Sequence, residues 1–474
     1  MNKPAHNYIV VCTVVFSLFI CLFSPVNNKV YAAEEVLGEA TTFTDSQMNL
    51  LIAKPAVVQI ANIITGEMTI QASLASTLGA PEIAGMYYEF TIGFGGSGFF
   101  VTDDGYLITN GHVAKPDNEL VAYYGISQVA DLVYWDAIIY SWEYLYGYTP
   151  TESEVESYYD EILYSYYNGD YESLVWDLYV TNYKGGDLKM DNVKYHNYVQ
   201  TGDAVGTEDQ VKQQGEAATI IDTLYEGDFD SRDLALLKVD GSNFPTVELG
   251  DDSNVNIGSD VYVIGYPAIV EEATGYFTDV EANLEPTITK GIVSAKKELI
   301  DGTEAFQTDA SISGGNSGGP VLDSDSKVIG VATWTISEYG GAESYNFMIS
   351  VDNVNSLLDR NNVVPNKGIT TEKWEEALEQ YSNKCYTFAK EDFEEVKDLY
   401  PDNIDVDDFI SKCQEAIENG EDECIGDNNI WYIVGGVVCC VVLTFGVVGV
   451  IIFVLVIKKK KNKKINIQKK ANKK

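Results

Sequence analysis

The sequence contains little positive charge and little histidine for its size. Among 474 residues there are three histidines, and 31 lysines and arginines face 72 aspartates and glutamates. All of the acidic residues lie between Glu34 and Asp427. Lys3, Lys29 and ten lysines of the C-terminal tail lie outside that segment, which therefore keeps 19 basic residues and a formal charge of −53. A surface of this sign repels polyanions, so nucleic acid is excluded as the main ligand.

Cysteine is also scarce. None of the seven cysteines lies between positions 34 and 384, so core packing rather than disulfide bonds must hold that segment together. This usage is typical of a bacterial cell surface rather than of a secreted animal protein. Further on, Cys385 and Cys413 both fall on apolar faces of expected helices. They could pair, which would leave Cys424 odd, or both could be buried free thiols.

Patterns that bind metals are missing as well. The aspartates of 323–327 lack the ligand spacing and the closing glutamate of a calcium-binding EF-hand loop, which favours a hairpin tip there. The sequence contains no zinc-binding constellation. We therefore expect no metal and no cofactor.

Two uncharged runs mark the ends of the chain. Residues 8–23 form an apolar run after Lys3, followed by the small residues Ala32 and Ala33, which predicts a secretory signal peptide over 1–33. An uncleaved anchor is the alternative. Residues 430–457 carry no charge and are long enough for one transmembrane helix. The lysine-rich residues 458–474 then predict a cytoplasmic tail, with the preceding domains outside the membrane.

One stretch has the composition of a catalytic loop rather than of a core. It reads Ser313-Gly314-Gly315-Asn316-Ser317-Gly318-Gly319-Pro320, and its glycines allow several backbone N–H groups to converge beside a serine hydroxyl. The alternative is an ordinary turn between two strands. A serine nucleophile would need a base to accept its proton and a third group to orient that base.

The histidines leave one candidate for the base. His112 follows two strand-like runs at the end of an expected hairpin, whereas His6 lies in the leader and His196 in a polar, tyrosine-rich region. The third group is expected to be Asp233, because it opens an apolar run of strand length. Its neighbours Asp228 and Asp230 are rivals.

Together these motifs resemble the HtrA/DegP-type, trypsin-like serine proteases over about residues 54–358. The resemblance implies a mainly β fold with two β-barrels and the triad His112, Asp233 and Ser317 in the cleft between them. It also implies an oxyanion hole from the N–H groups of Gly315 and Ser317, and endopeptidase activity on protein or peptide substrates through an acyl-enzyme. The alternative is a surface binding or sensor protein with an idle protease fold. The motifs that carry the resemblance are Gly96-Ser97-Gly98-Phe99, Thr109-Asn110-Gly111-His112-Val113, Asp233-Leu234-Ala235-Leu236-Leu237, Ile264-Gly265-Tyr266-Pro267, Thr289-Lys290-Gly291-Ile292-Val293-Ser294, Gln307-Thr308-Asp309-Ala310 and Gly315-Asn316-Ser317-Gly318-Gly319-Pro320.

Two departures from the family pattern affect the expected site. Ser313-Gly314 replaces the usual Asn-Pro, so the loop that enters the oxyanion hole is less constrained. Asn316 stands where digestive trypsin-like enzymes carry an aspartate that pairs with a new N-terminus, so activation by such pairing is not expected. By the same similarity, Ser311 would form the floor of the substrate pocket and Thr333-Trp334-Thr335 one wall. This set carries no charge and predicts cleavage after small aliphatic residues.

The remaining segments complete the expected organisation. A tether at 34–53 leads to a protease domain at 54–364, in which a tyrosine-rich helical insertion occupies about 116–172. Its helices are expected over 152–167, after a capping box, and over 131–146. The insertion is either a cap on the first barrel or a lid or exosite beside the cleft. An acidic helical stalk at 365–429 shows no recognisable PDZ domain, and the oligomeric state stays open.

Overall fold

The computed structural model describes residues 43–201, 208–225, 232–266, 286–299, 302–312, 315–337 and 344–424. The predicted signal peptide at 1–33, the predicted membrane span at 430–457, the tail at 458–474 and the rivals Asp228 and Asp230 lie outside the described residues. None of the helices in the described ranges combines the length and the hydrophobicity of a membrane span.

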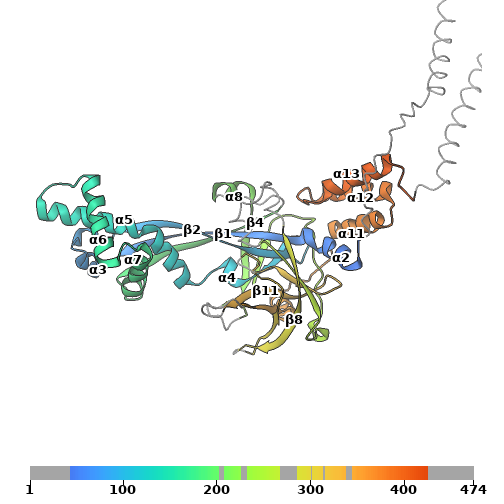
Figure 1. The fold of residues 1–474 in the computed structure, drawn as a ribbon, viewed down its shortest axis with the longest axis horizontal. Coiled ribbons are helices and arrows are strands. Elements are labelled where there is room, and N and C mark those ends of the chain that lie inside the picture. The colour runs from blue at the N-terminus through green and yellow to red at the C-terminus, as the bar shows by residue number, and fades with distance from the viewer. Residues whose placement is uncertain are drawn as a thin grey trace, which may run out of the picture. The chain divides into compact units, whose positions relative to one another are not determined.

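Two closed barrels of six antiparallel strands confirm the expected double barrel (Figure 1). The expectation of a mainly β chain does not hold for the described residues, because α-helices contain more of them than strands do. The first barrel has the strand order β1-β2-β3-β6-β5-β4, and the second has the order β10-β11-β12-β9-β8-β7. The first consists of β1 (Val57–Ile70), β2 (Tyr87–Phe100), β3 (Tyr106–Thr109), β4 (Leu188–Gln200), β5 (Glu216–Thr223) and β6 (Ala235–Val239). The second consists of β7 (Asp260–Gly265), β8 (Thr287–Glu298), β9 (Glu304–Thr308), β10 (Pro320–Leu322), β11 (Val328–Ser337) and β12 (Ser344–Ser350).

The two barrels share a buried apolar cluster. Phe99 and Leu236 of the first barrel belong to the same cluster as Ile264, Leu322 and Ile349 of the second. Each barrel also has a separate interior cluster. Because no cysteine is present in this part of the chain, the shared cluster is what holds the barrels against each other, as the composition predicts.

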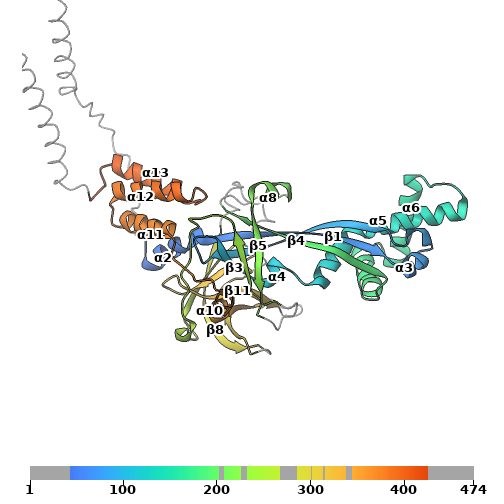
Figure 2. The same ribbon diagram turned by 180° about the vertical axis from the view of Figure 1, so that it is seen from behind.

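Three strands of the first barrel extend far beyond it. β1 and β2 have 14 residues each and β4 has 13, whereas β3 has four. Beyond the rung at which Ile63 pairs with Gly93 and His196, their side chains pack with helices in a separate apolar cluster. We call residues 63–93 and 118–196 the head (Figure 2). The insertion is therefore larger than the predicted segment of about 116–172, because it includes the outer halves of barrel strands.

The helices of the head are α3 (Ala72–Thr77), α5 (Asn118–Tyr146), α6 (Glu152–Tyr167) and α7 (Tyr171–Asp177), with a π-helical turn at Leu178–Tyr183. The prediction for α6 is confirmed, because Thr151 and Glu154 form the capping box and Asn168 ends the helix with φ 55°. The second helix begins at Asn118 rather than near 131. Asp117 caps it by accepting hydrogen bonds from the N–H groups of Glu119 and Leu120.

The C-terminal stalk is a bundle of three helices, α11 (Ile369–Ser382), α12 (Tyr386–Leu399) and α13 (Val406–Glu418). They pack around Trp374, Phe393 and Phe409 together with α2 (Asp45–Ala53), which occupies part of the segment expected to be a tether. The indole N–H of Trp374 donates to the carbonyl oxygen of Leu51 at 2.7 Å. The stalk is therefore docked on an N-terminal helix.

The cysteines of the stalk do not form the Cys385–Cys413 pair that the sequence allows. Cys385 forms a disulfide with Cys424, and Cys413 is free and buried in the bundle. The chain after α13 returns to the start of α12, where the N–H of Glu423 donates to the carbonyl oxygen of Lys384 at 3.0 Å. This return places Cys424 beside Cys385, whereas Cys413 faces the packed interior.

The remaining described helices are short, apart from α10 (Val351–Arg360), which follows β12 and packs against the barrels. They are the 3-10 turns at Lys54–Ala56, Pro81–Ile83 and Asp252–Asn254, and the helices α4 (Gly111–Ala114) and α8 (Glu208–Gln214).

Trp374→Ala is expected to destabilise the stalk by about 3–5 kcal/mol, because the indole is 1 % exposed and its removal leaves a cavity and an unpaired Leu51 carbonyl. Urea unfolding followed by circular dichroism measures the effect. Phe388→Ala is the control, since this ring of α12 is 44 % exposed. Equal losses for the two variants would contradict the packing described here.

Candidate active site

His112 lies in a short helical turn that follows β3. The turn, α4, is held from both sides: Asn62 of β1 donates through Nδ2 to the carbonyl oxygens of Val113 and Ala114, at 3.0 and 2.9 Å. Asn110, just before the turn, donates through Nδ2 to the carbonyl oxygen of Asp233 at 2.6 Å. These buried contacts fix the backbone that carries the imidazole.

Asp233 contacts His112 at two points. Its Oδ2 lies 2.6 Å from Nδ1 of the imidazole, and its Oδ1 accepts a hydrogen bond from the backbone N–H of His112 at 2.9 Å. The carboxylate is nearly buried, whereas the imidazole is 35 % exposed. The pair predicted from sequence is therefore in contact, and the imidazole still faces solvent on one side.

The charges of this pair shift both pKa values. Burial opposes protonation of the imidazole, but the charge of Asp233 and its hydrogen bond outweigh burial and raise the pKa of His112. Burial also opposes ionisation of Asp233, but His112 and the hydrogen bond from Thr333 lower the pKa of this carboxyl below its ordinary value. Asp233 is therefore a carboxylate that favours a charged imidazole.

Thr333 joins the carboxylate to the glycine-rich loop. Its Oγ1 donates to Oδ2 of Asp233 at 2.8 Å, and its carbonyl oxygen accepts a hydrogen bond from Oγ of Ser317 at 2.9 Å. His112, Asp233 and Ser317 thus lie in one network through a single residue of β11. No hydrogen bond joins Ser317 to the imidazole of His112 in the described part of the chain.

The loop around Ser317 requires glycine. Gly318 has φ 89°, and a Cβ there would lie 2.1 Å from the carbonyl oxygen of Ser97. Gly315 has φ 92°. Both positions therefore need a backbone conformation that favours glycine, and Gly318 also needs the close approach that only glycine allows.

Ser97 clamps this loop from the first barrel. Its side chain is fully buried, and its Oγ donates to the carbonyl oxygen of Gly315 at 2.7 Å and accepts from the N–H of Tyr266 at 2.9 Å. Its backbone N–H donates to the carbonyl oxygen of Ser317 at 2.8 Å. The sequence shows Ser97 only within the motif Gly96-Ser97-Gly98, and no local pattern there predicts this contact across the barrels.

The predicted pocket residues are only partly described. Ser311 is exposed in the segment after β9, and its carbonyl oxygen accepts from Oγ1 of Thr289 at 2.9 Å. The hydroxyl of Thr333 is directed to Asp233. The side chains of Trp334 and Thr335 lie outside the described residues, although both positions belong to β11. The pocket assignment stays a prediction.

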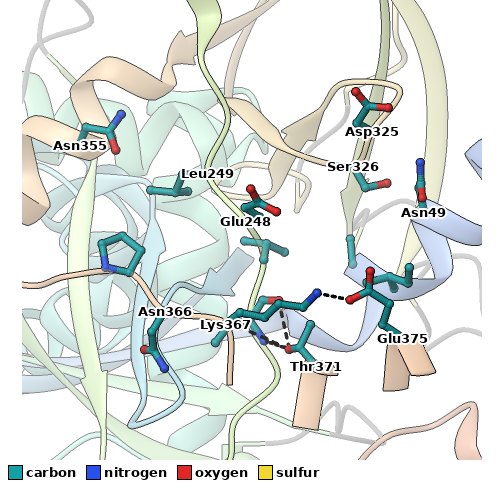
Figure 3. A pocket seen from close by; sticks show the side chains of 15 residues that line it. Asn49, Glu248, Leu249, Asp325, Ser326, Asn355, Asn366, Lys367, Thr371 and Glu375 are labelled. Atoms are coloured by element: carbon teal, nitrogen blue, oxygen red, sulfur yellow. Dashed lines mark hydrogen bonds and ion pairs between the residues drawn. The ribbon is translucent and has the colours of Figure 1, made fainter. Parts of the chain in front are cut away.

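A cavity in the described part of the chain lies elsewhere, where α2, the segment before β7 and the start of the stalk meet (Figure 3). It has a volume of about 550 Å³, and an ion pair between Lys367 and Glu375 spans part of it. The N–H of Thr246 donates to Oγ1 of Thr371 at 2.7 Å in its wall. Neither His112, Asp233 nor Ser317 lines this cavity, so it is separate from the triad candidates.

Comparisons with known proteins agree with this geometry. Residues 176–331 match the family described as trypsin-like peptidase domain. A protein of Pseudomonas putida (strain W619), named probable periplasmic serine endoprotease DegP-like, is 34 % identical over 155 residues, which cover 32 % of this chain and 29 % of that protein. The matched segments are thus similar to trypsin-like peptidase domains and to serine endoproteases named DegP-like.

Further matches are a second DegP-like relative and a solved structure. A probable periplasmic serine endoprotease DegP-like of Rickettsia conorii is 37 % identical over 135 residues, which cover 27 % of this chain and 24 % of that protein. The solved structure of the HtrA-type protease AlgW with a decapeptide covers 67 % of this chain and 67 % of its own, at 19 % identity and a TM-score of 0.35. The matches to these two DegP-like relatives span less than a third of the relatives' length.

The midpoint of the His112 titration is expected to lie above the ordinary pKa of an imidazole, because Asp233 favours the charged form. In Asp233→Asn the favourable charge is lost while burial remains, so the midpoint should move downward, below that of the wild type. Since the chain has three histidines, NMR of the imidazole protons can follow each one. His6→Gln and His196→Gln each remove one of the other two imidazoles and so identify the signal of His112. An unchanged midpoint in Asp233→Asn would refute the coupling.

Ser97→Ala is expected to lower kcat about ten- to hundredfold with little change in KM, because the Gly315 carbonyl loses its buried donor and the oxyanion loop loses a constraint. Steady-state kinetics on a peptide substrate measures this. Ser127→Ala removes a serine hydroxyl that donates to a backbone carbonyl on α5, away from the loop, and serves as the control. A wild-type kcat in Ser97→Ala would show that the clamp does not position the loop.

Proposed function

We propose that the protein is a serine endopeptidase that cleaves protein or peptide substrates through an acyl-enzyme, with Ser317 as nucleophile, His112 as base and Asp233 as the group that orients the base. The observation that carries the proposal is the network in which Thr333 contacts both Ser317 and Asp233, while Asp233 contacts His112. The match to the trypsin-like peptidase domain and the names of the DegP-like relatives support it.

The proposed reaction uses each group at a stated atom. Oγ of Ser317 attacks the substrate carbonyl while Nε2 of His112 accepts its proton, and Asp233 stabilises the resulting imidazolium through Nδ1. The N–H groups of Gly315 and Ser317 donate to the oxyanion that forms. His112 then donates the proton to the departing amine, and the acyl-enzyme remains. Water, activated by the same imidazole, releases the product acid and restores Ser317.

The first step requires Ser317 to exchange its partner. In the structure its hydroxyl donates to the carbonyl oxygen of Thr333, so the side chain must rotate toward His112 before attack. This exchange is a rotation of the Ser317 hydroxyl about the Cα–Cβ bond, which is a smaller change than a rearrangement of the loop. The clamp by Ser97 keeps the backbone of the loop in place during this exchange.

A neutral substrate pocket is part of the proposal. Ser311, Thr333, Trp334 and Thr335 carry no charge, so a buried Lys or Arg side chain of the substrate would lack compensation for its desolvation. Thr335 stands where a glycine would leave the pocket open. Its side chain would narrow the pocket, which favours substrates with small aliphatic side chains.

The proposed location is a membrane surface, with the peptidase domain outside the cytoplasm. The uncharged residues 430–457 followed by a lysine-rich tail support a single-pass anchor, and residues 1–33 support secretion. The DegP-like relatives are named periplasmic, which supports an extracytoplasmic location.

Two observations favour a second candidate, an idle protease fold that binds without cleaving. Ser317 has its hydroxyl on Thr333 rather than on His112, and the sequence has Ser313-Gly314 where HtrA-type proteases usually have Asn-Pro. An idle fold would retain the network and the barrels but would not react with electrophiles that mimic substrates.

A fluorophosphonate probe separates the two candidates. The wild-type protein is expected to become labelled at Ser317 without prior proteolytic nicking, because the base and the orienting carboxylate are already in contact. Ser317→Ala should abolish labelling, and Ser411→Ala, a serine of the stalk, should not alter it. Absence of labelling in the folded wild type would favour the idle fold.

A further inference from the structure

The head exposes a cluster of large aromatic rings where α5 ends and α6 begins. Trp142 lies at its centre, with ring centroids 4.8 Å from Tyr146, 6.4 Å from Tyr148 and 6.0 Å from Tyr158. Tyr146, Tyr148 and Tyr158 are 62, 50 and 45 % exposed. We call these four residues the aromatic tip. Contiguous exposed rings are unusual on a soluble surface and mark sites of interaction.

Packing explains two other tyrosines of the head, Tyr88 and Tyr159, but not those of the aromatic tip. Tyr88 donates to Asp136 at 2.8 Å, and Tyr159 donates to Asp131, in contacts that are partly buried. Burial and the neighbouring carboxylates raise the pKa of both phenols. These pairs hold the interior of the head. The tyrosines of the aromatic tip face outward instead, so the interior of the head does not require their rings.

The charge around the aromatic tip selects a cation. Positions 123–183 hold 11 acidic and no basic residues. Glu154 accepts a hydrogen bond from the hydroxyl of Tyr148 at 3.2 Å, and Glu143 accepts one from Thr149, so two carboxylates border the rings. The negative face of an aromatic ring and a nearby carboxylate both attract an ammonium or guanidinium group.

The head already binds one ammonium group in this way. Nζ of Lys184 lies 5.1 Å from the centroid of the Tyr179 ring and 3.1 Å from Oε2 of Glu119. The hydrogen bonds to Glu119 and to Tyr179 raise the pKa of Lys184. A tyrosine face paired with a glutamate is therefore sufficient to hold a lysine on this surface.

The length of α5 sets the kind of partner. The helix begins six residues after His112 and has 29 residues, so the aromatic tip at its far end is about 43 Å from its start. An extended chain that reached from the start of α5 to the aromatic tip would need about 12 residues or more. A shorter peptide cannot contact both of these places, whereas an unfolded protein segment can.

We propose that the aromatic tip is a docking surface for lysine-rich, extended segments of polypeptide. Lysine side chains lie on the rings of Tyr146 and Tyr158, with Glu143 and Glu154 beside them. That the docked segment is also a substrate rests on the proposed endopeptidase function, but the docking itself does not require catalysis.

Equilibrium binding tests the docking on the full chain carrying Ser317→Ala. The probe is a fluorescent 12-residue peptide of alternating lysine and serine, compared with the same peptide acetylated on every lysine. Binding of the lysine peptide should weaken with added salt, and acetylation should reduce it at least tenfold, because both contacts need the positive charge. Equal binding of the acetylated peptide would overturn the proposal.

Variants then assign the surface. Tyr146→Ala with Tyr158→Ala should weaken binding about five- to thirtyfold, while the double phenylalanine variant should stay within about twofold, because it keeps both ring faces. Tyr164→Ala with Tyr166→Ala removes two exposed tyrosines of α6 outside the cluster and should change nothing. The double leucine variant keeps apolar volume but lacks the ring faces, so it should bind as weakly as the double alanine variant. If the alanine variant unfolds, the leucine variant shows whether the rings are needed for binding. Full binding by the leucine variant, or equal loss in the control, would contradict the assignment.

Cleavage by the wild-type protein tests whether docked segments are substrates. Two peptides share one cleavable sequence and carry, 15 residues away, either a lysine-rich or a glutamine-rich tail. The lysine tail should lower KM about fivefold or more in the wild type and not in the double alanine variant, with kcat unchanged. Equal KM values would overturn the substrate role. If neither peptide is cleaved, the proposed endopeptidase function fails, and the binding measurements still decide whether the aromatic tip docks lysine-rich chains.

Discussion

The candidate site depends on one buried carboxylate. Asp233 is nearly excluded from water, and an ionised group in that position is stable only when hydrogen bonds replace its hydration. It accepts from the backbone and the imidazole of His112, in the first barrel, and from Thr333, in the second. The same charge therefore orients the base and links the two barrels at the place where the nucleophile lies. Any movement that separated the barrels here would leave this charge short of donors.

Short-range patterns explain what the sequence predicts well. His112 and Ser317 stand in short motifs that can be recognised from adjacent residues alone. The capping box of α6 and the Asn168 that ends it likewise lie within 18 residues. The sequence does not predict that Thr333 joins Asp233 to Ser317, because this depends on the direction of its hydroxyl and its carbonyl group in β11. Its position in the sequence is equally consistent with a pocket wall. The start of α5 was missed because this helix is apolar on several faces, so periodicity marks no boundary. The Cys385–Cys424 pairing depends on the return of the chain after α13, which no local pattern reports.

Both barrels position the glycine-rich loop. Ser317 belongs to the second barrel, yet its carbonyl oxygen and that of Gly315 both accept hydrogen bonds from Ser97 of the first. In the described part of the loop, this constraint comes from across the interface between the barrels, through a fully buried serine.

The head is attached at the point where the histidine turn is held. Asn62 of β1 and Asn197 of β4 are paired in register, and both donate through Nδ2 to the carbonyl oxygen of Ala114, at 2.9 and 3.0 Å. The next rung outward, at Ile63, already belongs to the head. Two strands of the head thus contact the chain at Ala114, and α5 begins at Asn118, so all three meet it within six residues of His112. These contacts are buried and closely packed, so the head and the turn that carries the proposed base are held together. A loop inserted between strands would meet this turn only through its two ends, whereas extended barrel strands also meet it through paired side chains.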